Sequence, residues 1–531
     1  MNATADDDNN VYLAAVEGGG TTFVVSVACV VMVPSEDENS RDDANDNINI
    51  LNMGSARLQL LHTATIPKRD EVTGEIPNYT PEQIIKETCS FFRQHLPPCG
   101  KYSALGIATF GPAGVDLNSK LQYGKILSGS PKKQWRGVDI LSPIREACGL
   151  TVGDDGAFDE RVAFDTDVNA PAVAEFRHRC YLQQQQQRRR QQSSNSSPFP
   201  PSSKPLTSLS YITIGTGVGV GLVLNSQPLH GLLHPEGGHV CIQPLPHDKF
   251  AGYSWGENSP YKGLATVEGV ASSVALTERW IQMEQEGETV KKLYGKDQQQ
   301  QHNRKRNNSN NNNGDNAQTR EILSTLPDSH PIWIHASNAI ANLCVSLLLL
   351  TSCQKIVLGG GIMKRDILFA MVRRRVWTLL NGYLDSVEEL REESKLDEII
   401  VRSSWEEVGS GLVGAFALAL DAYEKVGVEE EDERGGTGVR TALDSDDGDK
   451  KKAITKKSEQ HVFTSGVLTG IGLSFGCALI MSLFWAIAPK MRRWQRMMVQ
   501  LIYVFEMTIT LYNFYISYRS LYENCNAPRT L

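Results

Sequence analysis

The sequence contains few cysteines and no C-x-x-C pair. Its ten cysteines are scattered over 531 residues. This spacing argues against both a disulfide framework and a thiolate zinc site. We therefore expect reduced, mostly buried thiols in a protein of the cytosolic environment.

The chain also lacks an excess of positive charge, with a formal net charge of −8. This balance argues against a broad nucleic-acid-binding face, so no nucleic-acid partner is expected. The acidic N-terminus, MNATADDDNN, has no basic region followed by an apolar stretch, and we expect neither a signal peptide nor a transit peptide there. Residues 1–10 are expected to be disordered.

Three internal segments have too few apolar residues to offset the entropy of ordering. Residues 34–47 are acidic, residues 183–204 contain five consecutive glutamines and a proline cluster, and residues 295–319 are rich in Gln and Asn. Each lies between strongly patterned segments. We therefore expect disordered loop insertions rather than binding elements.

A strand, glycine turn and strand pattern occurs twice, at residues 11–31 and 209–224. The repeat predicts a duplicated α/β architecture with an N-terminal lobe at 11–180, an insertion at 181–206 and a C-terminal lobe at 207–426. The remaining pattern predicts further strands and helices. Strands are expected at 57–66, 103–111 and 355–361, a strand entering a helix at 161–180, and helices at 80–96, 330–352, 364–381 and 409–426.

The composition changes abruptly after a charged linker at residues 427–460. Residues 462–488 are 27 residues without a charge, which is long enough to span a bilayer. A basic cluster at 490–496 and an apolar, aromatic stretch at 497–518 follow. We expect residues 461–531 to be a transmembrane or membrane-associated tail that anchors the globular part facing the cytosol. Erroneous joining of unrelated sequence is the alternative, and the protein would then be cytosolic.

The two glycine turns are Glu17-Gly18-Gly19-Gly20-Thr21-Thr22 and Gly215-Thr216-Gly217-Val218-Gly219. Glycines at a hairpin tip let backbone N–H groups approach a phosphate, and threonine hydroxyls add donors. One such turn is a weak signal. A pair at the start of two repeated halves indicates the two-lobed, actin-like fold of sugar kinases, in which both hairpins face one nucleotide.

Four further segments are TDVNAPAVAEF (166–176), GLLHPEGGH (231–239), KIVLGGGIM (355–363) and FGP (110–112). In this order, and together with EGGGTTF, SPKKQW and SYITIGTGVGVG, they resemble the ROK family of sugar kinases, most closely its bacterial-type fructokinase branch. The resemblance covers about residues 11–423, less the insertions. It implies ATP and Mg²⁺ as cofactors, a hexose substrate and a possible homodimer.

The resemblance implies a role for each matched residue. Asp167 corresponds to the general base, and a mere helix N-cap is the alternative that the four matched residues around it disfavour. Asn169, Glu236 and His239 correspond to sugar-hydroxyl ligands. Glu17 corresponds to the acid that helps to hold hydrated Mg²⁺. The glycine turns Gly18–Thr22, Gly215–Gly217 and Gly359–Gly361 correspond to ATP-binding loops.

The sequence departs from the family pattern in two places. Ser254, Glu257 and Pro260 stand where the fructokinase branch usually has Cys, His and Cys, so no structural zinc is expected. The positioning of His239 then needs another support, for which Tyr253, Trp255 and Tyr261 are candidates. Thr22 stands where the branch commonly has Lys.

The leading hypothesis is an ATP-dependent hexose kinase that converts fructose to fructose 6-phosphate. Glucose, mannose or an N-acetylhexosamine are alternative substrates, because sugar choice depends on few side chains. A catalytically inactive, membrane-tethered sugar sensor or scaffold is the alternative from another class. A ROK transcriptional repressor is disfavoured, since only ten residues precede the first strand.

Overall fold

The computed structural model describes residues 10–31, 50–53, 56–70, 75–119, 121–150, 159–192, 204–294, 322–405 and 408–435. Nearly all of them belong to one compact unit, Met1–Glu433. The linker beyond residue 435, the predicted membrane segments and the whole of the predicted insertions at 34–47 and 295–319 lie outside the described residues.

The first sheet has the order β3-β4-β2-β1-β5-β6. The predicted hairpin at 11–31 is confirmed as β1 (Tyr12–Gly18) and β2 (Phe23–Val31), which pair antiparallel. Two parallel strands, β5 (Ala104–Thr109) and β6 (Val162–Thr166), continue the sheet beyond β1. On the other side lie β4 (Ala56–Ile66) and a short strand that the sequence reading missed, β3 (Ile50–Met53).

The second sheet repeats this plan with the order β11-β10-β7-β8-β9. The antiparallel hairpin is β7 (Leu209–Ile214) and β8 (Val218–Leu224). The parallel strands β10 (Lys355–Gly359) and β11 (Ile400–Arg402) lie beyond β7, and the short β9 (Gln227–Pro228) lies beyond β8. The duplicated architecture predicted from the two glycine turns is therefore present.

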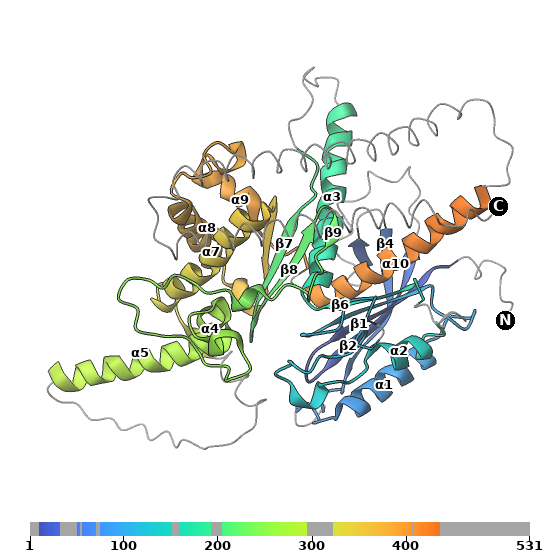
Figure 1. Cartoon of the computed structure of the whole chain (residues 1–531), viewed down its shortest axis with the longest axis horizontal. Helices are drawn as coiled ribbons and strands as arrows, with labels where there is room; N and C mark the ends of the chain where they lie inside the picture. Colours follow the sequence, from blue (N-terminus) through green and yellow to red (C-terminus); the bar gives the residue numbers. More distant parts are fainter. Residues whose placement is uncertain are drawn as a thin grey trace, which may run out of the picture. The chain divides into compact units, whose positions relative to one another are not determined.

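Helices cover both sheets (Figure 1). α1 (Pro81–Gln94) and α2 (Leu141–Ala147) pack on one face of the first sheet. α3 (Asn169–Gln192) and α10 (Ser410–Gly435) pack between the two sheets. The second sheet carries the remaining helices on its other face: α4 (Val267–Ala271), α5 (Ser273–Tyr294), α7 (Ile332–Thr351), α8 (Ile367–Leu380) and α9 (Leu396–Ile399).

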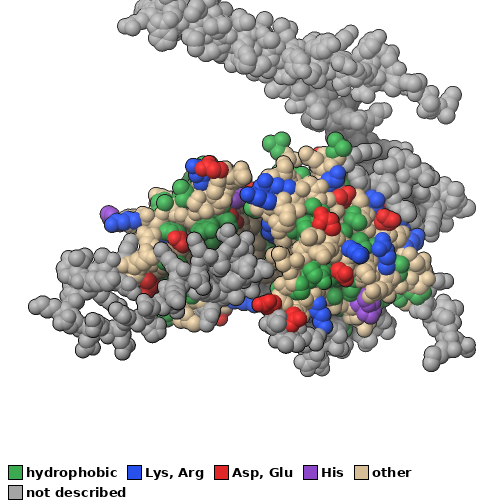
Figure 2. Space-filling model, turned by 90° about the horizontal axis from the view of Figure 1, so that it is seen from below, with side chains coloured by type: hydrophobic (Ala, Val, Ile, Leu, Met, Phe, Trp, Pro, Cys, Tyr) green, Lys and Arg blue, Asp and Glu red, His purple; other side chains and the backbone are tan. Residues whose placement is uncertain are grey.

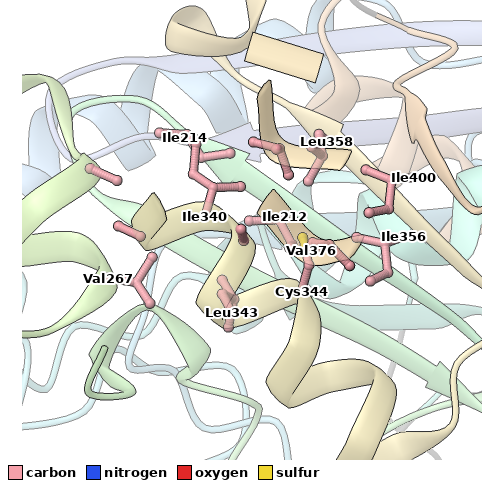
Figure 3. Packing of buried hydrophobic residues seen from close by; sticks show 14 of the residues in the cluster. Ile212, Ile214, Val267, Ile340, Leu343, Cys344, Ile356, Leu358, Val376 and Ile400 are labelled. Carbon is pink, nitrogen blue, oxygen red and sulfur yellow. The ribbon is translucent and has the colours of Figure 1, made fainter. Parts of the chain in front are cut away.

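The period of two along each strand divides its side chains between these layers. On β1, Leu13 and Ala15 face the central helices, whereas Ala14 and Val16 face α1 and α2. The third core lies between the second sheet and its outer helices. Figure 3 shows residues of β7, β10, β11, α4, α7 and α8 meeting there.

Two helix ends show how well local sequence signals work. α1 begins as predicted, with a capping box between Thr80 and Gln83 and with Pro81 in its first turn. α3, in contrast, continues through the glutamine run to Gln192, so the prediction of a disordered insertion is wrong for residues 183–192. Glutamine is a good helix former, and Gln183 ties the helix to Lys204 and Leu206 by hydrogen bonds of 2.9 and 3.1 Å.

In the part of the chain that the structure describes, α7 is the one helix long and apolar enough to cross a membrane. Two thirds of its apolar window (67%) is buried within the protein, against α8 and the second sheet. We therefore interpret α7 as a core helix. On the face shown in Figure 2, acidic, basic and apolar side chains are interspersed over the described surface.

Candidate active site

The turn between β1 and β2 is the first of the predicted phosphate turns. The backbone N–H of Gly19 donates to the Thr22 carbonyl over 2.8 Å, which closes the turn. A Cβ atom on Gly19 would lie 2.6 Å from the Thr22 carbonyl oxygen, so a side chain does not fit there. Gly18, Gly20, Thr21 and Thr22 complete the turn, and Thr21 is exposed. The turn thus presents backbone and hydroxyl donors.

The second and third glycine turns lie side by side at the carboxyl ends of β7 and β10. Gly215 donates to the Gly217 carbonyl over 2.9 Å, with Thr216 at the tip. Gly360 has a φ of +91° and lies so close to Ile214 that a Cβ would come within 2.5 Å of its carbonyl oxygen. The structure therefore joins Gly359–Gly361 to the Gly215–Gly217 turn, as expected for a shared ligand.

Asp167 directly follows β6, and its backbone N–H donates to the Thr109 carbonyl at the end of β5 over 2.7 Å. Burial raises the pKa of its carboxyl to about 7, with the Lys132 ammonium acting in the opposite direction and Glu17 adding to the increase. A carboxylate with a pKa near the working pH is suited to accept a proton.

Glu236 and His239 come from the other half of the chain, and the charge of the Glu236 carboxylate interacts with that of Asp167. Burial raises the pKa of Glu236 to about 7, and the carboxylates of Glu268 and Asp167 reinforce the shift. Its side chain is nevertheless 43% exposed, so a ligand can reach it from solvent. His239 Nε2 lies 3.9 Å from a Glu236 oxygen, and its Nδ1 has no hydrogen-bond partner among the residues that the structure describes. These two residues offer a donor and an acceptor to a polyol.

Asn169 is fully buried, and protein groups already engage its side chain. Its Oδ1 accepts from the Leu222 N–H over 3.2 Å, and its Nδ2 donates to an Asp165 oxygen over 3.1 Å and, more weakly, to the Leu229 carbonyl over 3.4 Å. Asp165 also contacts His230 Nε2 over 2.8 Å. Asn169 thus links β6 to the β8–β9 hairpin, and its predicted contact with sugar stays a prediction.

Sequence reasoning did not single out Asp165, His230 or Glu268. Hydrogen bonding to Asp165 raises the pKa of His230. Glu268 accepts from the Val218 N–H over 2.9 Å and so braces the second glycine turn. These partners are 50 or more residues apart. The first histidine of GLLHPEGGH, His234, accepts a hydrogen bond from the Ala113 N–H over 3.2 Å.

Glu17 lies at the amino end of α10. Burial raises the pKa of its carboxyl, and a hydrogen bond from the Leu412 N–H opposes this. A Cβ on Gly411 would come within 2.3 Å of a Glu17 oxygen, so the contact requires glycine there. The Glu17 carboxylate thus occupies the positive end of a helix dipole while keeping acceptor capacity for other ligands.

The segment in which the family places zinc ligands is held by backbone and aromatic contacts. Tyr253 donates to the Gly269 carbonyl and Trp255 to the Lys262 carbonyl, over 2.7 and 2.9 Å. The rings of Tyr253 and Trp255 pack at 4.9 Å. Tyr261, the third aromatic candidate, is 68% exposed and does not take part. Among the described residues, no group of three or more His, Cys, Asp or Glu side chains is arranged to hold a metal.

A cavity of about 780 Å³ lies elsewhere, near the amino end of β10, and no predicted site residue lines it. Both basic and acidic side chains line it, among them Arg179, Lys355 and Glu398. We do not assign it to the site.

Comparisons with known proteins found a matching family model and several related sugar kinases. The ROK family model matches residues 200–422. A fructokinase of Zymomonas mobilis is 29% identical over 352 residues, which is 66% of this chain and 89% of the relative. A putative fructokinase of Bacillus subtilis is 28% identical over 352 residues, 66% of this chain and 88% of the relative.

Two solved structures are similar at lower identity. A ROK hexokinase from Thermus thermophilus aligns with a TM-score of 0.44 at 17% identity, covering 79% of this chain and all of that chain. A ROK family glucokinase from Streptomyces griseus, in complex with glucose and AMPPNP, gives a TM-score of 0.44 at 16% identity, covering 78% of this chain and all of that chain.

The duplicated sheets and paired glycine turns define an α/β protein of the actin-like kinase class. Residues 200–422 carry a ROK family domain, and the chain is a sugar kinase similar to bacterial fructokinases.

Proposed function

We propose that the protein transfers the γ-phosphoryl group of ATP to a hexose, with fructose as the preferred substrate and fructose 6-phosphate as the product. The observation that carries the proposal is Asp167, a largely buried carboxyl with a pKa of about 7 that stands at the ends of β5 and β6 and interacts with Lys132 and Glu17. The names of the relatives support fructose as the sugar.

In the proposed reaction, the sugar hydroxyl oxygen attacks the γ-phosphorus while its proton passes to the Asp167 carboxylate. The bond from the γ-phosphorus to the bridging oxygen breaks, and ADP leaves with that oxygen. Phosphoryl transfer depends mainly on positioning and on neutralising charge. The three glycine turns supply backbone donors to the phosphates, and Glu236 and His239 orient the sugar.

Mg²⁺ is the metal that the family implies. It prefers hard oxygen ligands, keeps several waters, and is usually held by substrate phosphates with one or two carboxylates. The carboxylates of Glu17 and Asp167 fit this donor chemistry, and Glu17 would hold the ion through water. When bound, the ion would neutralise charge on the phosphates.

The test uses the full chain with ATP and a panel of fructose, glucose, mannose and N-acetylhexosamines. We expect transfer with a preference for fructose, and its loss in Asp167→Asn. Asp397→Asn is the matched control, because Asp397 lies on α9 and its side chain is 66% exposed. Sugar binding without transfer to any hexose would instead support the sensor or scaffold alternative.

We also propose that the tail anchors the kinase to a membrane with its active site in the cytosol. The support is the uncharged run at 462–488 and the basic cluster after it. Membrane fractionation of the full chain, compared with a chain ending at residue 435, tests this. Recovery of both in the soluble fraction would refute the anchor. Light scattering of the same samples tests the homodimer that the family resemblance suggests.

A further inference from the structure

The segment SPKKQW (130–135) is anchored against the first glycine turn. The indole N–H of Trp135, in the short helical turn Lys133–Trp135, donates to the Gly20 carbonyl over 3.0 Å. The Trp135 ring is buried and stacks on Phe23 at a centroid distance of 5.3 Å. Phe23 opens β2, directly after the turn. The segment is therefore held in a fixed position over the tip of the hairpin.

This anchoring brings the side chain of Lys132 into the site. Its Nζ lies 3.8 Å from the centre of the Phe110 ring. It also lies close to Gly20, where a Cβ would come within 2.1 Å of Nζ, so in this position the side chain uses the space left by the glycine. Burial lowers the pKa of Lys132 to about 8, and the charge of Asp167 opposes that shift. The ammonium group thus lies between the phosphate turn and the proposed base.

The two hairpin turns do not themselves supply a positively charged side chain to this position. Neither Gly18–Thr22 nor Gly215–Gly219 contains a lysine or arginine. The described groups that interact with Asp167 are Lys132, Glu17 and Glu236, and two of these three are acids. A triphosphate entering this environment brings further negative charge, which a fixed cation offsets most effectively where water is scarce.

We propose that the Lys132 ammonium binds oxygen atoms of the transferred phosphoryl group and neutralises charge on it during transfer to the sugar. This role rests on the proposed function and assigns a catalytic residue to it. Lysine suits the task because its flexible stem lets a compact charge follow a moving group. The Phe110 ring holds the stem and ammonium in the absence of nucleotide.

The test compares Lys132→Met with Lys133→Met in the full chain. Lys133 is the matched control, because it is the adjacent lysine and is exposed. Methionine keeps an apolar contact with Phe110, and thermal melting shows whether each variant folds. We expect Lys132→Met to lower kcat by about a hundredfold or more, with a smaller change in the KM for sugar, and Lys133→Met to match wild type.

The pH dependence of kcat distinguishes two roles of Lys132: a charge that acts on the reacting groups, and a structural support of the loop. Removing the ammonium leaves Asp167 facing Glu17 and Glu236, so the acid limb of the kcat profile should move to higher pH by about one unit or more. Lys132→Arg keeps the charge and should restore the position of that limb. An unchanged limb in Lys132→Met would overturn the role.

Measuring nucleotide binding tests the phosphate contact of Lys132 separately from sugar phosphorylation. We expect Lys132→Met to weaken binding of AMPPNP about tenfold or more and to leave AMP binding unchanged. If wild type transfers no phosphate to any sugar but this difference appears, the kinase proposal fails and the phosphate contact stands. If both variants match wild type in transfer and in AMPPNP binding, Lys132 has no such role.

Discussion

Replacing Asp167 with Asn should abolish phosphoryl transfer and at the same time stabilise the folded protein. The pKa of Asp167 is raised from its ordinary value of 3.8 to about 7, chiefly by burial. A raised carboxyl pKa means that the folded state holds the proton more tightly than the unfolded state does. Below pH 4 both states are protonated and nothing is lost. As the pH rises from about 4 to 7, the unfolded chain releases the proton first, and folding becomes less favourable.

The size of this penalty follows from the difference of about three pH units between the two pKa values. Each unit corresponds to about 1.4 kcal/mol, so ionised Asp167 costs the fold about 4 kcal/mol above pH 7. This is an upper bound, because the residue is only partly shielded from water. Asparagine has nearly the same shape and carries no charge, so it removes the penalty.

Urea unfolding of wild type and Asp167→Asn at pH 5 and pH 8 measures the effect. The difference between the two proteins cancels the titration of groups that do not interact with Asp167. We expect Asn to stabilise at both pH values, by about 2 kcal/mol more at pH 8 than at pH 5. The N-cap interpretation predicts the opposite sign, because an ionised carboxylate at a helix start stabilises it and Asn would lose that contribution at pH 8. A stability loss at pH 8 would therefore refute our reasoning.

Three further predictions use the same structure. The kcat of wild type should rise with pH through about 7 and fall about tenfold by pH 6, because only ionised Asp167 accepts the proton; a flat profile measured from pH 5.5 to 8.5 would contradict this. Glu236→Gln should raise the hexose KM about tenfold with a smaller change in kcat, and an unchanged KM in steady-state assays would remove Glu236 from the sugar site. Gly106→Val should cost at least about 2 kcal/mol in urea unfolding, because a Cβ there would lie 1.9 Å from the Ala415 carbonyl oxygen of α10. Gly129→Ala, whose Cβ would meet only Pro112 at 3.5 Å, is its control and should be nearly neutral.

The elements that sequence predicted well are those specified by adjacent residues. The two hairpins follow from β-branched strands around glycines, and α1 follows from the Thr80 and Gln83 capping box. Because the same hairpin opens both halves, the duplicated sheets could also be predicted. β3 was missed since it is four residues long and lies after an acidic segment. The helix through the glutamine run was missed because polar composition was interpreted as disorder, although glutamine favours helix.

The candidate site was predicted only where a short motif carries a recognisable residue. Asp167, Glu236 and His239 belong to such motifs. Lys132 was visible within SPKKQW, but its role depends on Trp135 reaching Gly20, a contact between positions 115 residues apart. Asn169 shows the limit of motif reasoning. Its position matches the family pattern, yet its buried amide joins strands on both sides through Leu222 and Asp165.

The carboxylates that the fold gathers give a physical reason for a ligand at this site. Burial raises the pKa of Glu17, Asp167, Glu236 and Glu268, which come from distant parts of the sequence. Buried like charges oppose folding unless something offsets them. Glu17 and Glu268 also accept backbone hydrogen bonds, but groups with pKa values shifted in this way cluster at functional sites, so their convergence favours a chemical role. Their combined charge also favours cations, which is why Lys132 and a hydrated metal ion suit the place where a triphosphate would bind.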